Sequence, residues 1–120
     1  MRNMSFDYTT QQIQDRSKTV TRRLGWLRLK PGDRIAACKK CMGLKKGEKV
    51  ERLAELRIVS VRREPLCYIL DQGFAECARE GFPHMEPEQF VGFFCRYHRG
   101  CEPSTEITRI EFEYCDPEVS

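Results

Sequence analysis

The order of strand-like and helix-like segments constrains the fold of this chain more than any other feature. β-Branched and aromatic residues gather in segments typical of strands, near residues 5–8, 18–24, 34–38, 50–63 and 105–114. Helical patterns cover 11–17, 66–78 and 86–98. Because helices and strands do not alternate regularly, the sequence predicts an α+β fold. We expect an antiparallel or mixed sheet that forms a small β-barrel with two or three inserted helices.

The clearest helical pattern lies in residues 86–98. Phe90, Phe93, Phe94 and Tyr97 recur at helical spacing, and Pro87 suits the first helical turn. This spacing predicts one buried aromatic stripe that belongs to the core, with base stacking as the alternative role.

Length and composition are typical of one soluble globular domain. We expect a single domain over 1–120, with 115–120 as a flexible tail. No apolar run approaches the roughly 18 residues of a membrane span, and the first ten residues have no apolar stretch that could act as a signal peptide. We therefore expect a cytoplasmic protein with no membrane partner. Its expected oligomeric state is a monomer.

Charge is distributed unevenly along the chain. Residues 1–50 carry 13 Lys and Arg against 4 Asp and Glu, a balance of +9. Residues 51–120 carry 8 against 14, a balance of −6, which together gives the net charge of +3. Such a chain can present one basic face to a polyanion while staying nearly neutral, which favours a nucleic-acid or nucleotide partner.

The sequence has seven cysteines, an odd number, and no signal peptide accompanies them. Both observations favour free thiols over disulfides. Cys38 and Cys41 form a C-x-x-C, and Cys95, His98 and Cys101 form a C-x-x-H-x-x-C at the end of the predicted helix. Four of these five side chains could hold zinc if the loop and the helix end meet. The main expectation is unligated cysteines and no cofactor.

The segment from Arg16 to Arg23 reads R-S-K-T-V-T-R-R. It resembles the G-x-K-x-x-E-x-R signature of ASCH domains, a branch of the PUA-like superfamily, with Lys18 and Arg23 in the matching positions. Thr21 stands in the glutamate position, as in the amidohydrolases that deacylate N4-acetylcytidine. Arg16 stands in the glycine position, and an arginine there is expected to avoid positive φ.

Other segments carry the same resemblance at lower specificity, so that it extends from about residue 6 to 114. Leu29-Lys30-Pro31-Gly32-Asp33 resembles the K-x-G-D turn of the family, and residues 107–112 resemble its last strand. Residues 78–82 lie where the amidohydrolase branch has a glutamate after a helix. The resemblance implies a PUA-like barrel with a cleft for RNA or a nucleobase.

Resemblance to the amidohydrolase branch also implies residue roles. Thr21 would be the nucleophile, Lys18 its base and Glu80 the proton donor or acceptor, with Glu76 as the alternative to Glu80. Nearby arginines would lower the pKa of Lys18 and so favour the neutral base. Lys18 and Thr21 would share a face on a helical turn, but would lie on opposite faces of a strand.

The same residues also suit a binding protein, in which Lys18, Arg22 and Arg23 contact phosphates. Further basic residues are expected to form a rim around the cleft: Arg28, Lys30, Arg34, Lys39, Lys40, Lys45, Lys46 and Lys49. Trp26 would either stack on a base or pack against the protein. The main prediction is thus recognition of RNA or a modified nucleoside in a basic cleft. The alternatives are amidohydrolysis of N4-acylated cytidine and a metal-independent ribonuclease that uses Lys18.

Overall fold

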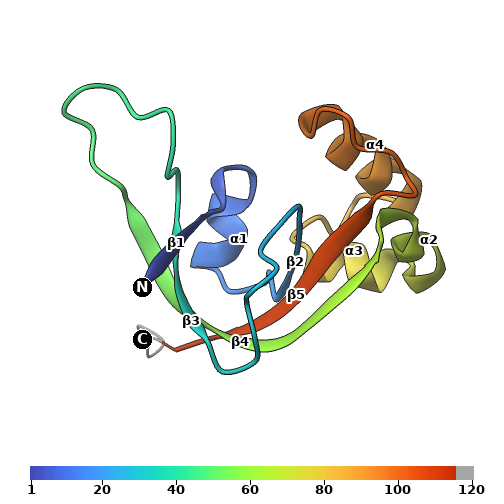
Figure 1. The fold of residues 1–120 in the computed structure, drawn as a ribbon, viewed down its shortest axis with the longest axis horizontal. Coiled ribbons are helices and arrows are strands. Elements are labelled where there is room, and N and C mark those ends of the chain that lie inside the picture. The colour runs from blue at the N-terminus through green and yellow to red at the C-terminus, as the bar shows by residue number, and fades with distance from the viewer. Residues whose placement is uncertain (116–120) are drawn as a thin grey trace.

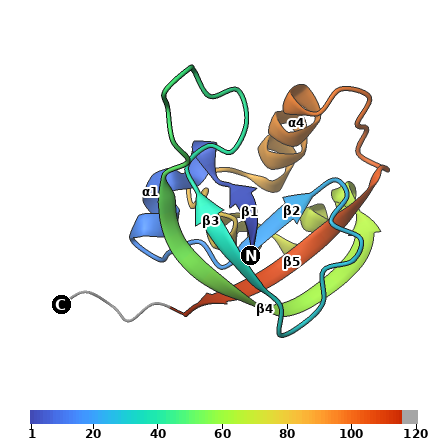
Figure 2. The same cartoon turned by 60° about the vertical axis from the view of Figure 1, so that its left-hand side comes forward.

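The computed structural model describes residues 1–115. Their central element is a curved, mixed β-sheet. Its strand order is β1-β3-β4-β5-β2; β1 runs parallel to β3, and the other neighbours are antiparallel. The strands are β1 (Arg2–Ser5), β2 (Val20–Arg23), β3 (Arg34–Cys38), β4 (Arg52–Pro65) and β5 (Glu106–Tyr114). Figures 1 and 2 show the sheet as a half-barrel, which confirms the predicted α+β fold with a mixed sheet.

Short helices occupy the open face and one end of this half-barrel (Figure 1). The α-helices in the described residues are α1 (Thr10–Gln14), α2 (Ile69–Gln72), α3 (Phe74–Arg79) and α4 (Pro87–Tyr97), with 3-10 turns at Asp7–Thr9 and Leu66–Tyr68. The helix predicted over 66–78 is divided, because Gly73 has a φ of 78° that an α-helix cannot contain. Within residues 1–115, no helix has the length and apolar character needed to cross a membrane.

The apolar side chains form two clusters. The first fills the half-barrel and includes Met4, Phe6, Ile13, Leu56 and Phe112. The second joins α4 to the far ends of β4 and β5, and includes Leu66, Ile69, Phe90, Phe94 and Ile107. The long strand β5 contributes to both clusters, with Phe112 in the first and Ile107 in the second. A register shift between Ile58 and Ser60 accompanies the bend of β4 and β5 (Figure 1).

The edge strands β1 and β2 approach each other across the open side of the half-barrel. Arg23 Nη2 on β2 donates a hydrogen bond to the carbonyl oxygen of Ser5 on β1, at 2.6 Å. This contact places the signature segment beside the end of β1.

The signature segment starts with a left-handed residue. Arg16 follows the end of α1 with a φ of 64°, so the expectation that it would avoid positive φ is wrong. A helix commonly ends in a left-handed residue, usually glycine, and the chain reversal here imposes this conformation despite a cost of about 1 kcal/mol. The Arg16 guanidinium lies 5.2 Å from the centre of the Tyr114 ring.

The C-terminal tail was predicted to be flexible from residue 115. The Cys115 N–H donates a hydrogen bond to the Glu55 carbonyl at 3.0 Å, and residues 116–120 lie outside the described residues.

Candidate functional site

A cavity of about 260 Å³ lies between the two edge strands and α4. Its polar part is formed by Lys18, Thr21, Arg22, Arg23 and Glu80, together with Ser5, Asp7 and Thr9. The rest of its lining is aromatic: Phe6, Tyr8, Phe82, Phe90, Phe93, Phe94, Tyr97 and His98. Phe6 belongs to the first apolar cluster, whereas Phe90 and Phe94 belong to the second, so the cavity lies where the two clusters meet.

Three elements fix the short segment that carries Lys18. The Lys18 N–H donates to the carbonyl of Gln12 on α1 at 3.2 Å. The Lys18 carbonyl accepts a hydrogen bond from the Tyr114 hydroxyl on β5 at 2.6 Å. The N–H of Thr19 donates to the carbonyl of Arg79 at the end of α3, at 2.9 Å. Lys18 is therefore positioned before β2 begins, without belonging to a helix or a strand.

Glu80 owes its position to the end of α3. The Gly81 N–H donates to the Ala78 carbonyl at 3.0 Å, and the Phe82 N–H donates to the Cys77 carbonyl at 2.9 Å. This pair of bonds is the Schellman motif, and Gly81 supplies the positive φ that the motif needs, at 100°. The turn holds Glu80 at the end of the helix.

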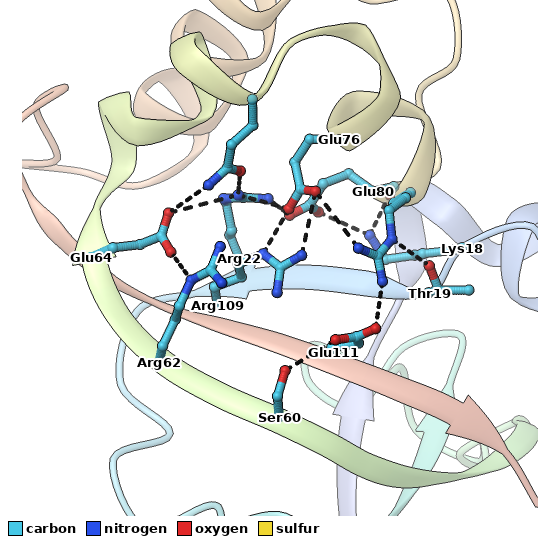
Figure 3. A network of polar contacts seen from close by, with 12 residues as sticks. Lys18, Thr19, Arg22, Ser60, Arg62, Glu64, Glu76, Glu80, Arg109 and Glu111 are labelled. Carbon is cyan, nitrogen blue, oxygen red and sulfur yellow. Dashed lines mark hydrogen bonds and ion pairs between the residues drawn. The ribbon is translucent and has the colours of Figure 1, made fainter.

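Lys18 and Glu80 form a buried ion pair (Figure 3). Lys18 Nζ lies 3.1 Å from Glu80 Oε1, each side chain is 3% exposed, and Nζ also donates to the Glu80 carbonyl oxygen. Arg22 Nη1 contacts the other carboxylate oxygen of Glu80 at 2.9 Å. Glu80 rather than Glu76 thus faces Lys18.

Burial lowers the pKa of Lys18 from the ordinary 10.5 to about 8. Attraction to Glu80 opposes this shift, whereas the positive charges of Arg23 and Arg22 add to it. A substantial fraction of Lys18 is therefore neutral near pH 8, as a general base requires.

Arg22 connects Glu80 to an interior network (Figure 3). Its Nη2 contacts Gln72 Oε1 at 2.7 Å and Glu76 Oε1 at 2.9 Å, and Arg109 Nε contacts the same Glu76 oxygen at 2.7 Å. Burial alone would raise the pKa of Glu76, but Arg109 and Arg22 outweigh it and lower that pKa. The Arg22 side chain is 0% exposed. Arg22, which was predicted to contact phosphate, therefore forms ion pairs with the buried carboxylates of Glu76 and Glu80.

Thr21 and Arg23 form the second polar pair of the cavity. Arg23 Nε donates to Thr21 Oγ1 at 3.0 Å, and the Arg23 guanidinium lies 4.7 Å from the centre of the Phe6 ring. Burial lowers the pKa of Arg23 to about 10, which leaves it charged at neutral pH. Lys18 and Thr21 both line the cavity although they share no helical turn, because Lys18 lies outside the regular strand.

Aromatic rings from separate segments form one wall of the cavity, which we call the aromatic wall. The Tyr97 ring centre lies 4.9 Å from that of Tyr8 and 4.8 Å from that of Phe93, and Phe82 lies 5.4 Å from Phe93. Tyr8 and Tyr97 are 63% and 49% exposed. Their faces and edges are thus partly open to a ligand.

The predicted buried stripe on α4 is correct only in part. Phe90 and Phe94 are buried in the second apolar cluster, whereas Phe93 is half-buried and Tyr97 is exposed. Sequence reasoning did not assign Tyr8 or Phe82 to the site, since only the folded chain brings them to α4.

Solved structures share this architecture. No family model matches the sequence, and no curated protein matches it at a significant level. An ASCH domain from Lactobacillus crispatus is similar with a TM-score of 0.60 and 18% identity, covering 94% of this chain and 78% of that chain. This chain has the ASCH fold. The predicted resemblance is thereby confirmed for the fold.

Two further structures agree. A hypothetical protein, PH0355, has a TM-score of 0.63 and 18% identity, covering 94% of this chain and 95% of that chain. EF3133 from Enterococcus faecalis, of the DUF984 family, has a TM-score of 0.61 and 17% identity, covering 96% of this chain and 80% of that chain. Identities this low describe the ASCH fold and do not assign an amidohydrolase branch.

The loop between β3 and β4, residues 39–51, adjoins the cavity, and we call it the lysine-rich loop. Lys39, Lys40 and Lys49 line a neighbouring hollow, and Asp7 lines both that hollow and the cavity. Lys45 and Lys46 are exposed on the same loop, which extends away from the sheet between β3 and β4 (Figures 1 and 2).

The remaining predicted binding residues lie elsewhere. Arg34 forms an ion pair with Glu55 at 2.7 Å and lines a different hollow together with Arg28. Trp26 packs against the first apolar cluster, and the Arg2 guanidinium lies 4.1 Å from the centre of its ring. Within residues 1–115, neither Trp26 nor Arg34 lines the cavity, so the predicted basic rim is divided.

The five candidate zinc ligands are not brought together. Residues 1–115 contain no group of three or more His, Cys, Asp or Glu side chains that could hold a metal ion. Cys38 and Cys41 lie at the start of the lysine-rich loop, which Figure 1 shows well apart from the end of α4. His98 Nδ1 is 2.8 Å from the Phe94 carbonyl oxygen, and Cys95 and Cys101 are neighbours of each other.

Proposed function

We propose that this protein recognises a nucleobase, within RNA or in a modified nucleoside, in the cavity beside Lys18, Thr21 and Glu80. One observation supports this most. The charged and hydroxyl groups of Lys18, Thr21, Arg23 and Glu80 share a single cavity with the aromatic wall. A base needs both surfaces, because it has an aromatic face and an edge of donors and acceptors.

The polar part of the cavity suits the edge of a base. Glu80 offers carboxylate oxygens, whereas Lys18 and Arg23 offer only donors. The Thr21 hydroxyl already accepts from Arg23 and can still donate. The cavity therefore presents both kinds of hydrogen-bonding group to one bound ring.

An RNA chain would continue from the cavity onto the lysine-rich loop. Asp7 lines both hollows, so a nucleotide in the cavity places its phosphates near Lys39, Lys40 and Lys49. Phosphate contacts of this kind fix the position of the chain, while the cavity reads the base. The ASCH fold accords with this proposal but does not itself assign a ligand.

Replacing an aromatic residue of the wall tests the proposal. Tyr97→Ala should weaken binding of cytidine, N4-acetylcytidine or a short single-stranded RNA by roughly 5- to 150-fold, because stacking contributes about 1–3 kcal/mol per base. Isothermal titration calorimetry measures the affinity. Tyr68→Ala is the matched control, since Tyr68 is 52% exposed against 49% for Tyr97 and does not line the cavity.

Two outcomes oppose the proposal. Wild-type protein that binds none of these ligands would contradict nucleobase recognition. Equal losses in Tyr97→Ala and Tyr68→Ala would show that the aromatic wall does not hold the base.

Amidohydrolysis of an N4-acylated cytidine is a second candidate, favoured by the lowered pKa of Lys18 beside Glu80. Neutral Lys18 would take the Thr21 proton as Thr21 Oγ1 attacks the acyl carbonyl, and Arg23 would stabilise the resulting oxyanion. The amine then leaves with a proton from the lysine or the glutamate, and water hydrolyses the acyl-threonine.

Acetate release from N4-acetylcytidine tests this second candidate. Turnover should be lost in Lys18→Ala and Thr21→Val, but retained in part in Thr21→Ser, which keeps the hydroxyl. Circular dichroism confirms that each variant is folded. A folded wild-type protein without turnover rejects the candidate for this substrate, and shortening of single-stranded RNA would instead favour the ribonuclease alternative.

A further inference from the structure

Two thiols face each other at the C-terminal end of α4. Cys95 Sγ lies 3.9 Å from Cys101 Sγ, and both residues are half-buried. A tight turn returns the chain to the helix, since the Cys101 N–H donates to the His98 carbonyl at 3.0 Å. Gly100 supplies a φ of 81° within this turn.

We propose that Cys95 and Cys101 form a redox-active dithiol, which a low-molecular-weight disulfide such as oxidised glutathione converts to an intramolecular disulfide. The sulfur atoms must approach by about 2 Å to reach the S–S bond length of about 2.05 Å. Side-chain rotation and a small adjustment of the turn at Gly100 suffice for such a movement. Neither nucleobase recognition nor amidohydrolysis uses these thiols.

The hydrogen bond between the thiols assigns them different roles. Cys95 donates its S–H to Cys101 Sγ, and Cys101 lies at the start of the exposed turn, where its own S–H donates to the Glu102 carbonyl oxygen at 3.7 Å. Burial, and then the hydrogen bond to Cys101, raise the pKa of Cys95, so we assign the first attack to Cys101.

The thiol–disulfide exchange proceeds in two steps. The Cys101 thiolate attacks one sulfur of oxidised glutathione, and the first glutathione leaves as a thiolate that takes up a proton. Cys95 then loses its proton and attacks Cys101 Sγ, which releases the second glutathione. The two cysteines lose two electrons, and the glutathione disulfide gains them.

Oxidation would act on the wall of the cavity. Tyr97 and His98 lie between the two cysteines in the sequence, and both line the cavity. The His98 ring stacks on Phe94 with their centres 4.0 Å apart. A disulfide encloses Tyr97 and His98 in a covalent ring, and so couples the thiol pair to the ligand cavity.

Tryptic peptide mapping tests the bond itself. Trypsin cleaves after Arg79, Arg96, Arg99 and Arg109, so Cys95 lies in peptide 80–96 and Cys101 in peptide 100–109. After treatment with oxidised glutathione, we expect these peptides to be linked, and to separate on reduction. Unlinked peptides after complete treatment would overturn the proposal.

Single variants test the assigned roles. Cys95→Ser should leave Cys101 carrying a stable mixed disulfide with glutathione, whereas Cys101→Ser should leave Cys95 unmodified under the same conditions. The reverse pattern would overturn the assignment of Cys101 as the attacking thiolate.

The imidazole NMR signals test the coupling to the cavity. The chain has two histidines, and His84 serves as the internal control because it lies outside the ring. Oxidation should shift the His98 signals and leave those of His84 in place, with His84→Gln used for assignment. A linked protein with unchanged His98 signals would overturn the coupling. None of these three tests requires a ligand, so all are independent of the proposed function.

Discussion

The buried environment of Lys18 brings its pKa close to neutral pH. Its pKa is lowered to about 8, so the neutral fraction rises as the pH increases through that value. If Lys18 is the general base, initial rates of N4-acetylcytidine hydrolysis should rise between about pH 6.5 and pH 9, with a midpoint near 8. A flat or falling profile across this range would argue against Lys18 as the base.

Glu76 is the residue that joins Arg22 to Arg109 in the buried network. Glu76→Gln leaves both guanidinium groups without their shared carboxylate, so the free energy of unfolding should fall by roughly 3 kcal/mol or more. Glu113→Gln is the matched control, because Glu113 is 50% exposed in its pair with Arg57 and should change stability by less than about 1 kcal/mol. Urea denaturation measures both variants, and equal small losses would contradict a structural role for the network.

At the level of elements, the end of α3 is the part of the fold that sets Glu80 against Lys18. A Cβ atom at Gly81 would lie 3.2 Å from Thr9 Cγ2, and its φ of 100° disfavours any other residue. Gly81→Ala should therefore destabilise the protein by about 1–3 kcal/mol.

Gly92 in α4 provides the opposite case for the same substitution. A Cβ atom at Gly92 meets no atom within 4 Å, so Gly92→Ala should stabilise the protein by about 0.5–1 kcal/mol through helix propensity. Thermal denaturation of the two alanine variants compares the effects. A loss at Gly92 would contradict its position inside α4, and a gain at Gly81 would contradict the left-handed turn that ends α3.

At the level of the whole molecule, the cavity and the lysine-rich loop provide two kinds of binding surface. Affinity for single-stranded RNA should fall steeply with salt, whereas affinity for a neutral nucleoside should change little. Replacing Lys39, Lys40 and Lys49 with Gln should reduce the salt dependence of RNA binding and spare nucleoside binding. Fluorescence anisotropy across a salt series measures how affinity depends on salt. Equal salt dependence for RNA and nucleoside would contradict the assignment of phosphates to the loop and the base to the cavity.

The sequence by itself determined the features that depend on local order. The alternating and helical spacings predicted β3, β5 and α4 closely, because side-chain periodicity follows directly from the backbone geometry of a strand or a helix. The signature around Lys18 and Arg23 predicted the ASCH fold that the solved structures confirm. Two local predictions were wrong: one predicted helix is split at Gly73, and the first strand covers Arg2–Ser5 rather than residues 5–8, where a 3-10 turn forms at Asp7–Thr9.

Only the tertiary structure decided which residues form the cavity. It turned Arg22 inward to Glu76 and Glu80, placed Trp26 against the core, and brought Tyr8 to Tyr97. These outcomes depend on packing between segments that lie far apart in the chain, on which local periodicity carries no information. The left-handed Arg16 shows the same dependence, since the path from α1 to β2 imposed a conformation that arginine alone disfavours.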